Sequence, residues 1–225
     1  MLEKTSLNNK KAHIVEIFNS IQGEGLFVGE MQTFVLFSGC NLRCAYCDTS
    51  HNKEISKEIS VKELTKELEE KSAKVVSLTG GEPLLHSDFI KELTANFKAS
   101  YYLETNGTLA DKLEQVIDSI DTVAMDIKLK SATGEENKFK ENEKFANIAK
   151  NAKNFFIKIV FDENITEEEI ENCVKIAKKN NTQIILQPKM PLAHNFEPEK
   201  IFNKFYKKYE FTRLIPQTHK FLNIR

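Results

Sequence analysis

Three cysteines lie close together in one short segment, at Cys40, Cys44 and Cys47, in the spacing C-x3-C-x2-C. Cysteine thiolates are the usual ligands of iron–sulfur clusters, and a four-iron cluster takes four such ligands. Three cysteines leave one iron with an open coordination site, where a small molecule can bind and receive an electron. The spacing therefore predicts chemistry at a cluster and not electron transfer alone.

A structural zinc site is the alternative interpretation of these cysteines, because zinc takes four Cys or His ligands. His51 follows Cys47 closely enough to complete such a set. The remaining cysteine, Cys173, falls on the apolar face of a predicted helix, together with Ile170, Val174 and Ala177. We therefore expect Cys173 in the core and not in a metal site.

The composition of the chain limits its class. Its 225 residues suit a single domain with a sizeable core, and 32 basic against 33 acidic residues give a net charge of −1. That balance offers no broad electrostatic footprint for nucleic acid, and no apolar run reaches the roughly 20 residues of a membrane-spanning helix. Residues Met1 to Lys11 are polar and lack the apolar core of a signal peptide. We expect a cytoplasmic protein with reduced thiols that acts on a small molecule.

Strand-like and helix-like segments alternate along the chain. Apolar runs predict strands at 33–37, 74–78, 101–104, 122–127, 155–161, 183–186 and 211–215, with an extra N-terminal strand at 13–18. Helices are predicted from 60, at 87–98, 110–120 and 143–152, from 166, and at 198–209. Capping boxes mark two helix starts, at Ser60–Glu63 and Thr166–Glu169, and Ser87 is a predicted N-cap.

This alternation predicts right-handed βαβ units and a parallel sheet. Six units are too few to close an eight-stranded barrel, so we expect an α/β fold of the partial (β/α)6, TIM-like barrel type. Its site would lie at the carboxyl ends of the strands. We expect one domain over 1–225, in which 1–32 form an N-terminal strand and substrate loop, 33–215 the barrel, and 216–225 a tail that closes the site.

Polar motifs follow the predicted strands at the edge where such a site would form. The cysteine segment follows the first strand, and Thr79-Gly-Gly-Glu-Pro83 follows the second, where paired glycines permit close backbone approach. Glu104–Gly107, Asp126–Lys128 and Gln187–Met190 end later strands, although each is also compatible with an ordinary turn or strand terminus. The irregular stretch 128–140 is either a lid or a solvated loop.

The cysteine segment, with the aromatic Tyr46 before its third cysteine, resembles the cluster loop of radical S-adenosylmethionine (radical SAM) enzymes, and Thr79–Pro83 resembles their TGGEP segment. The resemblance implies a [4Fe-4S] cluster on Cys40, Cys44 and Cys47, and S-adenosyl-L-methionine on its open iron. In that family, cleavage of the cofactor produces a 5′-deoxyadenosyl radical that abstracts hydrogen from the substrate. Implied contacts to the cofactor are Tyr46, Cys47, Asp48, Gly81, Asp126, Ile127, Lys128, Gln187, Pro188, Lys189 and Met190.

Three further segments, Ser20–Gly25, Cys47–Thr49 and Gln217–Lys220, resemble those of the 7-carboxy-7-deazaguanine synthases. This resemblance implies ring contraction of 6-carboxy-5,6,7,8-tetrahydropterin with loss of ammonia, in queuosine biosynthesis, and a homodimer reduced by a flavodoxin or ferredoxin. It also implies Mg2+ on the Thr49 hydroxyl. The implied substrate contacts are Ile21, Gln22, Gly23, the position of Leu36, Thr79 and the terminal carboxylate of Arg225.

One position departs from that family. Leu36 stands where an Arg is common and would pair with the substrate carboxylate. Arg43, Arg213 or Lys220 is a candidate to replace that charge, and an altered substrate is the alternative. Two other functions stay open at this stage: an activating enzyme for a glycyl-radical protein, which needs an open docking face, and a cluster or zinc protein without catalysis.

Overall fold

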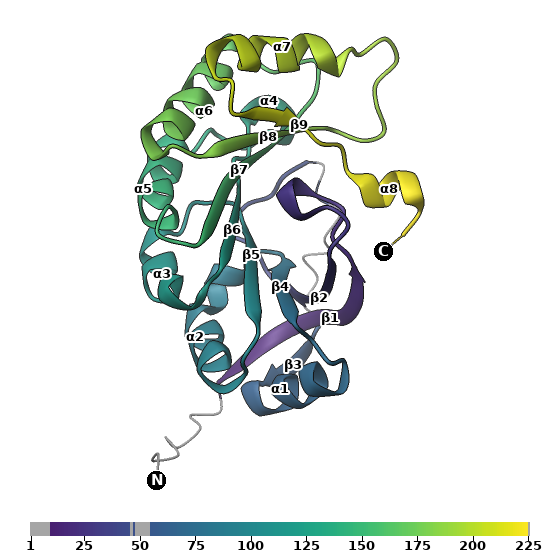
Figure 1. The fold of residues 1–225 in the computed structure, drawn as a ribbon, viewed down its shortest axis with the longest axis vertical. Helices are drawn as coiled ribbons and strands as arrows, with labels where there is room; N and C mark the ends of the chain where they lie inside the picture. The colour runs from purple at the N-terminus through teal and green to yellow at the C-terminus, as the bar shows by residue number, and fades with distance from the viewer. Residues whose placement is uncertain (1–9, 46, 48–54, 225) are drawn as a thin grey trace.

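The computed structural model describes residues 10–45, 47 and 55–224, and these residues form a curved sheet with a layer of helices along one side (Figure 1). The strand order is β3-β1-β2-β4-β5-β6-β7-β8-β9. The strands are β1 (Lys11–Ile21), β2 (Met31–Phe37), β3 (Lys57–Ser60), β4 (Val75–Gly80), β5 (Ser100–Thr105), β6 (Thr122–Asp126), β7 (Asn154–Phe161), β8 (Gln183–Pro188) and β9 (Thr212–Leu214).

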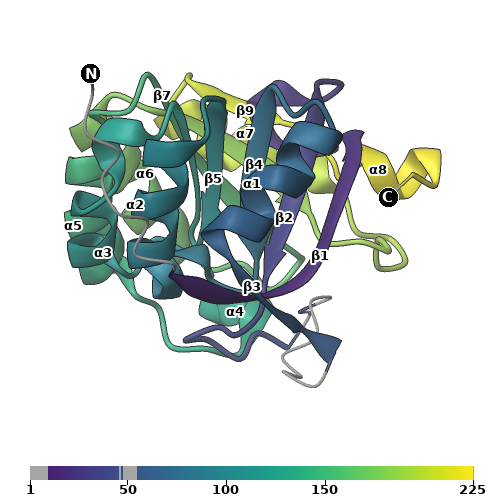
Figure 2. The same cartoon turned by 90° about the horizontal axis from the view of Figure 1, so that it is seen from below.

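Parallel pairing runs from β2 through β4 to β9, which confirms the predicted partial barrel. The N-terminal strand β1 is longer than predicted and pairs antiparallel with β2. Figure 2 shows the unpredicted strand β3 against the beginning of β1, where Lys11 pairs with Ser60.

The helices follow the strands as predicted, with shifted ends. They are α1 (Val61–Glu70), α2 (Ser87–Asn96), α3 (Ala110–Glu114), α4 (Lys130–Thr133), α5 (Phe139–Ala149), α6 (Glu167–Asn180), α7 (Pro198–Lys208) and α8 (Thr218–Leu222), with 3-10 turns η1 (Gly25–Phe27), η3 (Pro83–His86) and η4 (Ile117–Ser119). Both capping boxes are present. The predicted cap at Ser87 is wrong, because η3 leads directly into α2 and His86 takes the cap position. The predicted helix 110–120 is interrupted after Glu114.

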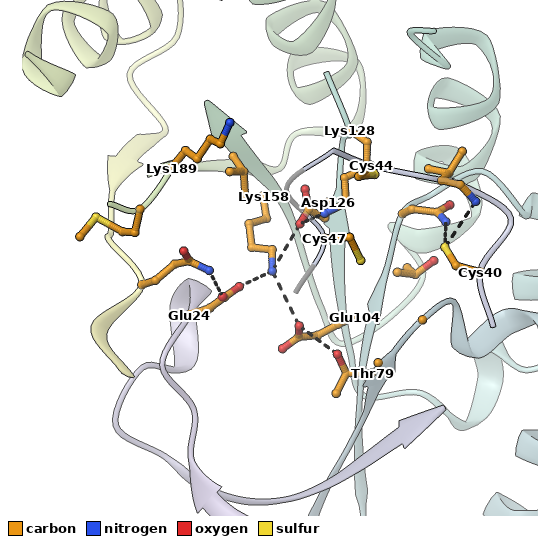
Figure 3. Close-up of a pocket in the computed structure, with 18 of the residues that line it drawn as sticks. Glu24, Cys40, Cys44, Cys47, Thr79, Glu104, Asp126, Lys128, Lys158 and Lys189 are labelled. Carbon is orange, nitrogen blue, oxygen red and sulfur yellow. Dashed lines mark hydrogen bonds and ion pairs between the residues drawn. The ribbon is translucent and has the colours of Figure 1, made fainter. Parts of the chain in front are cut away.

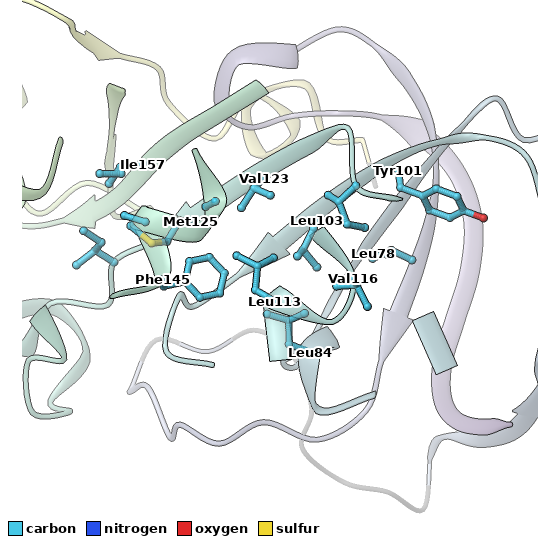
Figure 4. Packing of buried hydrophobic residues seen from close by; sticks show 14 of the residues in the cluster. Leu78, Leu84, Tyr101, Leu103, Leu113, Val116, Val123, Met125, Phe145 and Ile157 are labelled. Carbon is cyan, nitrogen blue, oxygen red and sulfur yellow. The ribbon is translucent and has the colours of Figure 1, made fainter. Parts of the chain in front are cut away.

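Alternating side chains give the sheet two different faces. Toward the helices, Leu103, Val123 and Ile157 join a large apolar core with residues such as Leu113 and Phe145 (Figure 4). On the opposite face, a smaller apolar cluster is formed by Tyr102, Ala124, Phe156 and Ile185, covered by Leu26 and Phe27 of η1.

Two residues further along the same strands, the face that carries the smaller apolar cluster becomes polar. Glu104, Asp126 and Lys158 each follow, two positions on, a member of that smaller apolar cluster. The polar side chains therefore form a layer above the apolar one, at the carboxyl ends of the strands. This layer is the floor of the site.

The stretch 128–140 is partly helical and not wholly irregular. It contains α4 and the start of α5, and Thr133 is buried. The carbonyl of Thr133 accepts a hydrogen bond from the backbone of Ala45 at 2.9 Å, and Glu135 accepts one from the backbone of Arg43 at 2.7 Å. The segment therefore braces the cysteine-bearing loop from outside.

Candidate active site

A cavity opens at the carboxyl ends of the parallel strands, and residues from both ends of the chain line it (Figure 3). The three clustered cysteines lie at one side of it and the polar layer at the other. Its lining consists of Glu24, Cys40, Leu42, Cys44, Cys47, Thr79, Gly80, Gly81, Glu104, Thr105, Asn106, Asp126, Lys128, Lys158, Val160, Lys189, Met190, Gln217 and Lys220.

The three cysteines are suited to a cluster. Cys40, Cys44 and Cys47 carry reduced thiols and line the same cavity. Within the described part of the chain, no three His, Cys, Asp or Glu side chains gather closely enough to hold one metal ion. A cluster places each thiolate on a different iron, and three free cysteines that line one cavity fit that requirement. Burial raises the pKa of Cys40, and raises that of Cys44 to about 11, so these thiols would have to release their protons to hold a cluster.

The turn after β4 packs directly on the strand end that precedes the cysteines. The backbone N–H of Gly81 donates to the Phe37 carbonyl, and that of Glu82 to the Gly39 carbonyl, each at 2.8 Å. A Cβ at Gly81 would lie 1.9 Å from the Gly39 oxygen, so this position requires glycine. Gly81 therefore presents bare backbone to the cavity, as a close-binding ligand requires.

Beneath this turn, Glu82 ties the ends of β4 and β5 together. Its fully buried carboxylate accepts hydrogen bonds from Thr105 Oγ1 and the backbone N–H of Asn106, both at 2.8 Å, and from the backbone of Leu84 at 3.1 Å. Burial raises the pKa of Glu82 to about 7, against the opposing effect of these donors.

Lys158 is the centre of the polar layer. Its ammonium lies 3.5 Å from Asp126 Oδ2 and 3.7 Å from Glu104 Oε2, and it donates a short hydrogen bond to Glu24 (Figure 3). Burial lowers the pKa of Lys158, but the three carboxylates outweigh it and hold that pKa well above its usual value. For Glu24, burial alone would raise the pKa of the carboxyl. The charge of Lys158 and hydrogen bonds from Lys158 and Gln217 outweigh burial and lower this pKa to about 2.

The two polar segments near the ends of the chain meet at this layer. Gln22 Nε2 donates to Glu104 Oε1 at 3.0 Å, and Gln217 Nε2 donates to Glu24 Oε1 at 2.7 Å. The backbone N–H of Thr218 donates to the Gly23 carbonyl at 2.9 Å. The tail therefore seals one wall of the cavity, on the side where Figure 1 shows α8 projecting beside β9.

Two buried polar groups near the cavity have unmet hydrogen-bonding capacity. Gln187 is completely buried, and neither atom of its side-chain amide has a hydrogen-bond partner among the described residues. The same holds for Asp126 Oδ1. Unpartnered buried atoms also occur away from the cavity, as at Thr65 and Asn180, but beside the cavity they leave hydrogen-bonding capacity that a ligand can use.

The structure distributes the predicted site residues in three groups. Those that line the cavity are Cys40, Cys44, Cys47, Thr79, Gly81, Asp126, Lys128, Lys189 and Met190. Those that lie behind or beside its lining are Ile21, Gln22, Gly23, Leu36, Ile127, Gln187 and Pro188. Tyr46, Asp48, Thr49 and Arg225 lie outside the described residues, and so does His51. The binding roles of all these residues stay predictions.

Sequence reasoning missed Lys158, the residue that organises the polar layer. The available signal was one charged residue within the apolar strand Asn154–Phe161. A lysine in the middle of a central strand is buried, and a buried lysine needs acidic partners. The sequence offers no indication of which carboxylates these are, because Glu24 is 134 positions away.

Comparison with known proteins agrees with this geometry. The family model of the Radical SAM superfamily matches residues 34–181, and the chain belongs to that superfamily. Its members use a [4Fe-4S] cluster and S-adenosyl-L-methionine, for which the three cysteines and the glycine turn are the matching elements.

Individual relatives narrow the assignment. The chain is 32% identical to a 7-carboxy-7-deazaguanine synthase of Archaeoglobus fulgidus, over 96% of this chain and 100% of that protein. A second, from Geobacter sulfurreducens, is 32% identical over 94% of this chain and 97% of its own length. The fold is similar to that of QueE from Escherichia coli, with a TM-score of 0.65 at 22% identity over 93% of this chain and 95% of that one. The protein belongs to the 7-carboxy-7-deazaguanine synthase family.

No helix within the described ranges is long and apolar enough to cross a membrane.

Proposed function

We propose that the protein converts 6-carboxy-5,6,7,8-tetrahydropterin to 7-carboxy-7-deazaguanine with release of ammonia, a carbon–nitrogen lyase reaction on the route to queuosine. The relatives that carry this enzyme name span nearly the whole chain. The observation that carries the proposal is that one cavity joins the three cysteines to a buried layer of carboxylates and amides. Such a layer suits a small heterocycle with several N–H groups.

Different residues of the chain bind the cluster with its cofactor and orient the substrate. Cys40, Cys44 and Cys47 hold the cluster, and the Gly81 backbone with Asp126 and neighbouring residues holds the cofactor against it. When bound, the cluster and S-adenosyl-L-methionine supply the radical that removes hydrogen from the substrate. The protein orients the substrate and keeps water from the reacting carbon.

Glu24 and Glu104 are the proposed acceptors for the ring N–H groups of the pterin. Each is a carboxylate with acceptor capacity beyond its present partners. Lys158 holds them at fixed positions, and Gln22 and Gln217 support one carboxylate each. This arrangement favours a substrate that donates several hydrogen bonds from one edge.

Recognition of the substrate carboxylate must differ from that of relatives with Arg at the position of Leu36. Leu36 pairs with Thr79 across β2 and β4, next to the cavity lining. Of the candidate replacements, Arg43 is directed to the carbonyls of its own loop, at 2.8 Å from Cys40 O, and Arg213 does not line the cavity. Lys220 does line it, so we assign the carboxylate to Lys220. Mg2+ on Thr49 is the proposed second contact.

The wider setting of the enzyme is also proposed by family resemblance. We place it in the cytoplasm as a homodimer, with a flavodoxin or ferredoxin as the electron donor for the cluster. Its substrate is a small molecule, with no direct contact to nucleic acid or membrane.

Anaerobic turnover tests the proposal. The reconstituted, reduced enzyme is incubated with S-adenosyl-L-methionine, Mg2+ and 6-carboxytetrahydropterin, and products are followed by mass spectrometry. We expect 7-carboxy-7-deazaguanine from the wild type, and a lower KM from Leu36→Arg. If a protein with a full cluster cleaves the cofactor but does not form this product, the proposed substrate is wrong. The substrate would then be another heterocycle or a protein partner.

A further inference from the structure

Asn106, at the end of β5, is fixed by hydrogen bonds at its backbone. Its N–H donates to Glu82 Oε2 at 2.8 Å, and its carbonyl accepts from Asn142 Nδ2 at 3.2 Å. Only 6% of the residue is exposed, and it lines the cavity beside the cysteines. These backbone hydrogen bonds and the burial of the residue therefore fix the direction of its side chain.

The orientation of the side-chain amide is determined by its neighbours. Asn106 Oδ1 accepts from the backbone N–H of Thr108 at 3.1 Å and from the Thr108 hydroxyl at 2.6 Å. A backbone N–H can only donate, so the oxygen must face Thr108 and the NH2 group must face the opposite way. On that side lie Asn41 Oδ1, at 2.8 Å, and Cys40 Sγ, at 3.9 Å.

These contacts close a ring between β5 and the cysteine loop. Asn41 Nδ2 donates to the Thr108 hydroxyl at 2.8 Å, so Asn41, Asn106 and Thr108 bind one another in turn. Asn41 follows Cys40 directly, and the ring therefore holds that ligand at a set place over the strand end. Cys40 Sγ also accepts from the backbone N–H of Leu42 at 3.4 Å (dashed lines at Cys40 in Figure 3).

We propose that Asn106 is a positioning residue for the cluster. Its amide docks the cysteine loop and donates an N–H···S hydrogen bond to the Cys40 thiolate, which raises the reduction potential of the cluster. Such a bond withdraws electron density from the thiolate and favours the reduced, more negative state. This role of Asn106 rests on the proposed function only in requiring the cluster, and it does not depend on which substrate the enzyme binds.

Two variants separate the hydrogen bond from charge. Asn106→Ala removes the donor without adding charge, and Asn106→Asp keeps the shape and the acceptor for Thr108 but replaces the donor by an anion. We expect a more negative midpoint potential in Asn106→Ala and a larger shift in Asn106→Asp, measured by redox titration followed by electron paramagnetic resonance without substrate. An unchanged potential in Asn106→Ala with full iron and sulfide content overturns the proposal.

Matched controls distinguish this bond from general effects. Asn172→Ala removes an exposed amide that donates to its own helix, at Glu168 O, and should leave the potential unchanged. Thr108→Val opens the ring but keeps the donor, so it should speed loss of iron several-fold with a smaller shift in potential than Asn106→Ala. An equal shift in Thr108→Val and Asn106→Ala overturns the assignment to the N–H···S bond.

A measurement on the unaltered enzyme decides the matter if the Asn106 variants fail to hold a cluster. Electron–nuclear double resonance is recorded on the reduced cluster after labelling asparagine side-chain amides with 15N. We expect a 15N coupling from the labelled side-chain amide; an exchangeable-proton coupling alone is also produced by the backbone N–H of Leu42 and does not count as support. Absence of the 15N coupling overturns the proposal. Because no pterin is present, either result leaves the proposed reaction to its own test.

Discussion

The polar layer depends more on Lys158 than on any one of its three carboxylate partners. Moving a charge out of water costs several kcal/mol unless close partners compensate it. Here one buried ammonium faces Glu24, Glu104 and Asp126 from three different segments. Removal of one carboxylate leaves the others in place, whereas removal of Lys158 leaves three acids close together without their common cation.

Glu24→Gln should change how stability depends on pH. The pKa of Glu24 is lowered from 4.5 to about 2 in the folded protein, so its ionised form stabilises the fold fully above pH 4.5 and progressively less as the pH falls toward 2. We expect Glu24→Gln to cost about 3 kcal/mol near pH 7 and much less near pH 3. Urea unfolding of both cluster-free proteins across this range provides the measurement. A constant difference at all pH values would contradict the assigned shift.

Each of the three clustered cysteines should be required for the cluster, and Cys173 should not. Replacement of Cys40, Cys44 or Cys47 by Ala removes one thiolate ligand and should reduce bound iron and sulfide, and product, to background. Cys173→Ala is the matched control, because Cys173 is fully buried on α6 and should cost only about 1 kcal/mol of stability. Chemical iron and sulfide analysis distinguishes the two classes. A full cluster in Cys44→Ala would refute the ligand assignment.

The βα turns convert the parallel strands into a single site. Their polar residues were recognisable in the sequence because each follows an apolar run, and the carboxyl ends of such strands meet at one edge. The edge strand β3 was not recognisable, since Lys57–Ser60 carries no apolar pattern and is defined by its pairing with β1. The role of residues 128–140 could not be predicted from the sequence either, because it depends on hydrogen bonds to a loop that lies almost a hundred residues earlier in the chain.

The glycine turn after β4 should tolerate no side chain at Gly81. In Gly81→Ala the new Cβ would meet the Gly39 carbonyl at 1.9 Å, so the turn must move away from the cysteine loop. We expect at least a tenfold weaker affinity for S-adenosyl-L-methionine, measured by isothermal titration calorimetry on the cluster-loaded enzyme. This corresponds to about 1.4 kcal/mol.

Gly29→Ala is the control for this substitution. Gly29 has a φ of +94°, but a Cβ added there would meet nothing within 4 Å, so only backbone strain of about 1 kcal/mol is expected. Its affinity for the cofactor should match that of the wild type. Equal affinities for Gly81→Ala and Gly29→Ala would mean that the close packing at Gly81 has no part in cofactor binding.

At the scale of the whole molecule, the predicted partial barrel is the architecture observed, but the sequence patterns did not reveal which segments meet when the sheet curves. Apolar periodicity reports which face of an element is buried, but the partners of Lys158 come from β1–η1, β5 and β6. Such contacts depend on how the complete sheet curves. The polar segments near both ends were recognisable as candidate site residues, whereas their direct contact through Glu24 and Gln217 was not.

Removal of the tail should weaken substrate binding with little effect on the fold. A chain that ends at Pro216 loses the hydrogen bonds of Gln217 to Glu24 and of Thr218 to Gly23, and it loses Lys220 from the cavity. Since α8 buries none of its residues, we expect the melting temperature to fall by only a few degrees and KM for the pterin to rise at least tenfold.

The matched control for this truncation is Phe221→Ser, on the same short helix. Its side chain is 59% exposed and does not line the cavity, so KM should not change. Steady-state kinetics under anaerobic conditions compare the two variants. An unchanged KM in the truncated chain would show that the tail has no role in holding the substrate.

The contact between Glu24 and Gln217 joins residues 193 positions apart. During synthesis on the ribosome, the cysteine loop and the first βα units emerge long before the segment that completes the wall around Glu24. A nascent chain can therefore present its thiols to the iron–sulfur assembly machinery before the substrate chamber exists. The order of translation therefore makes the thiols available before the chamber that would enclose the radical is complete.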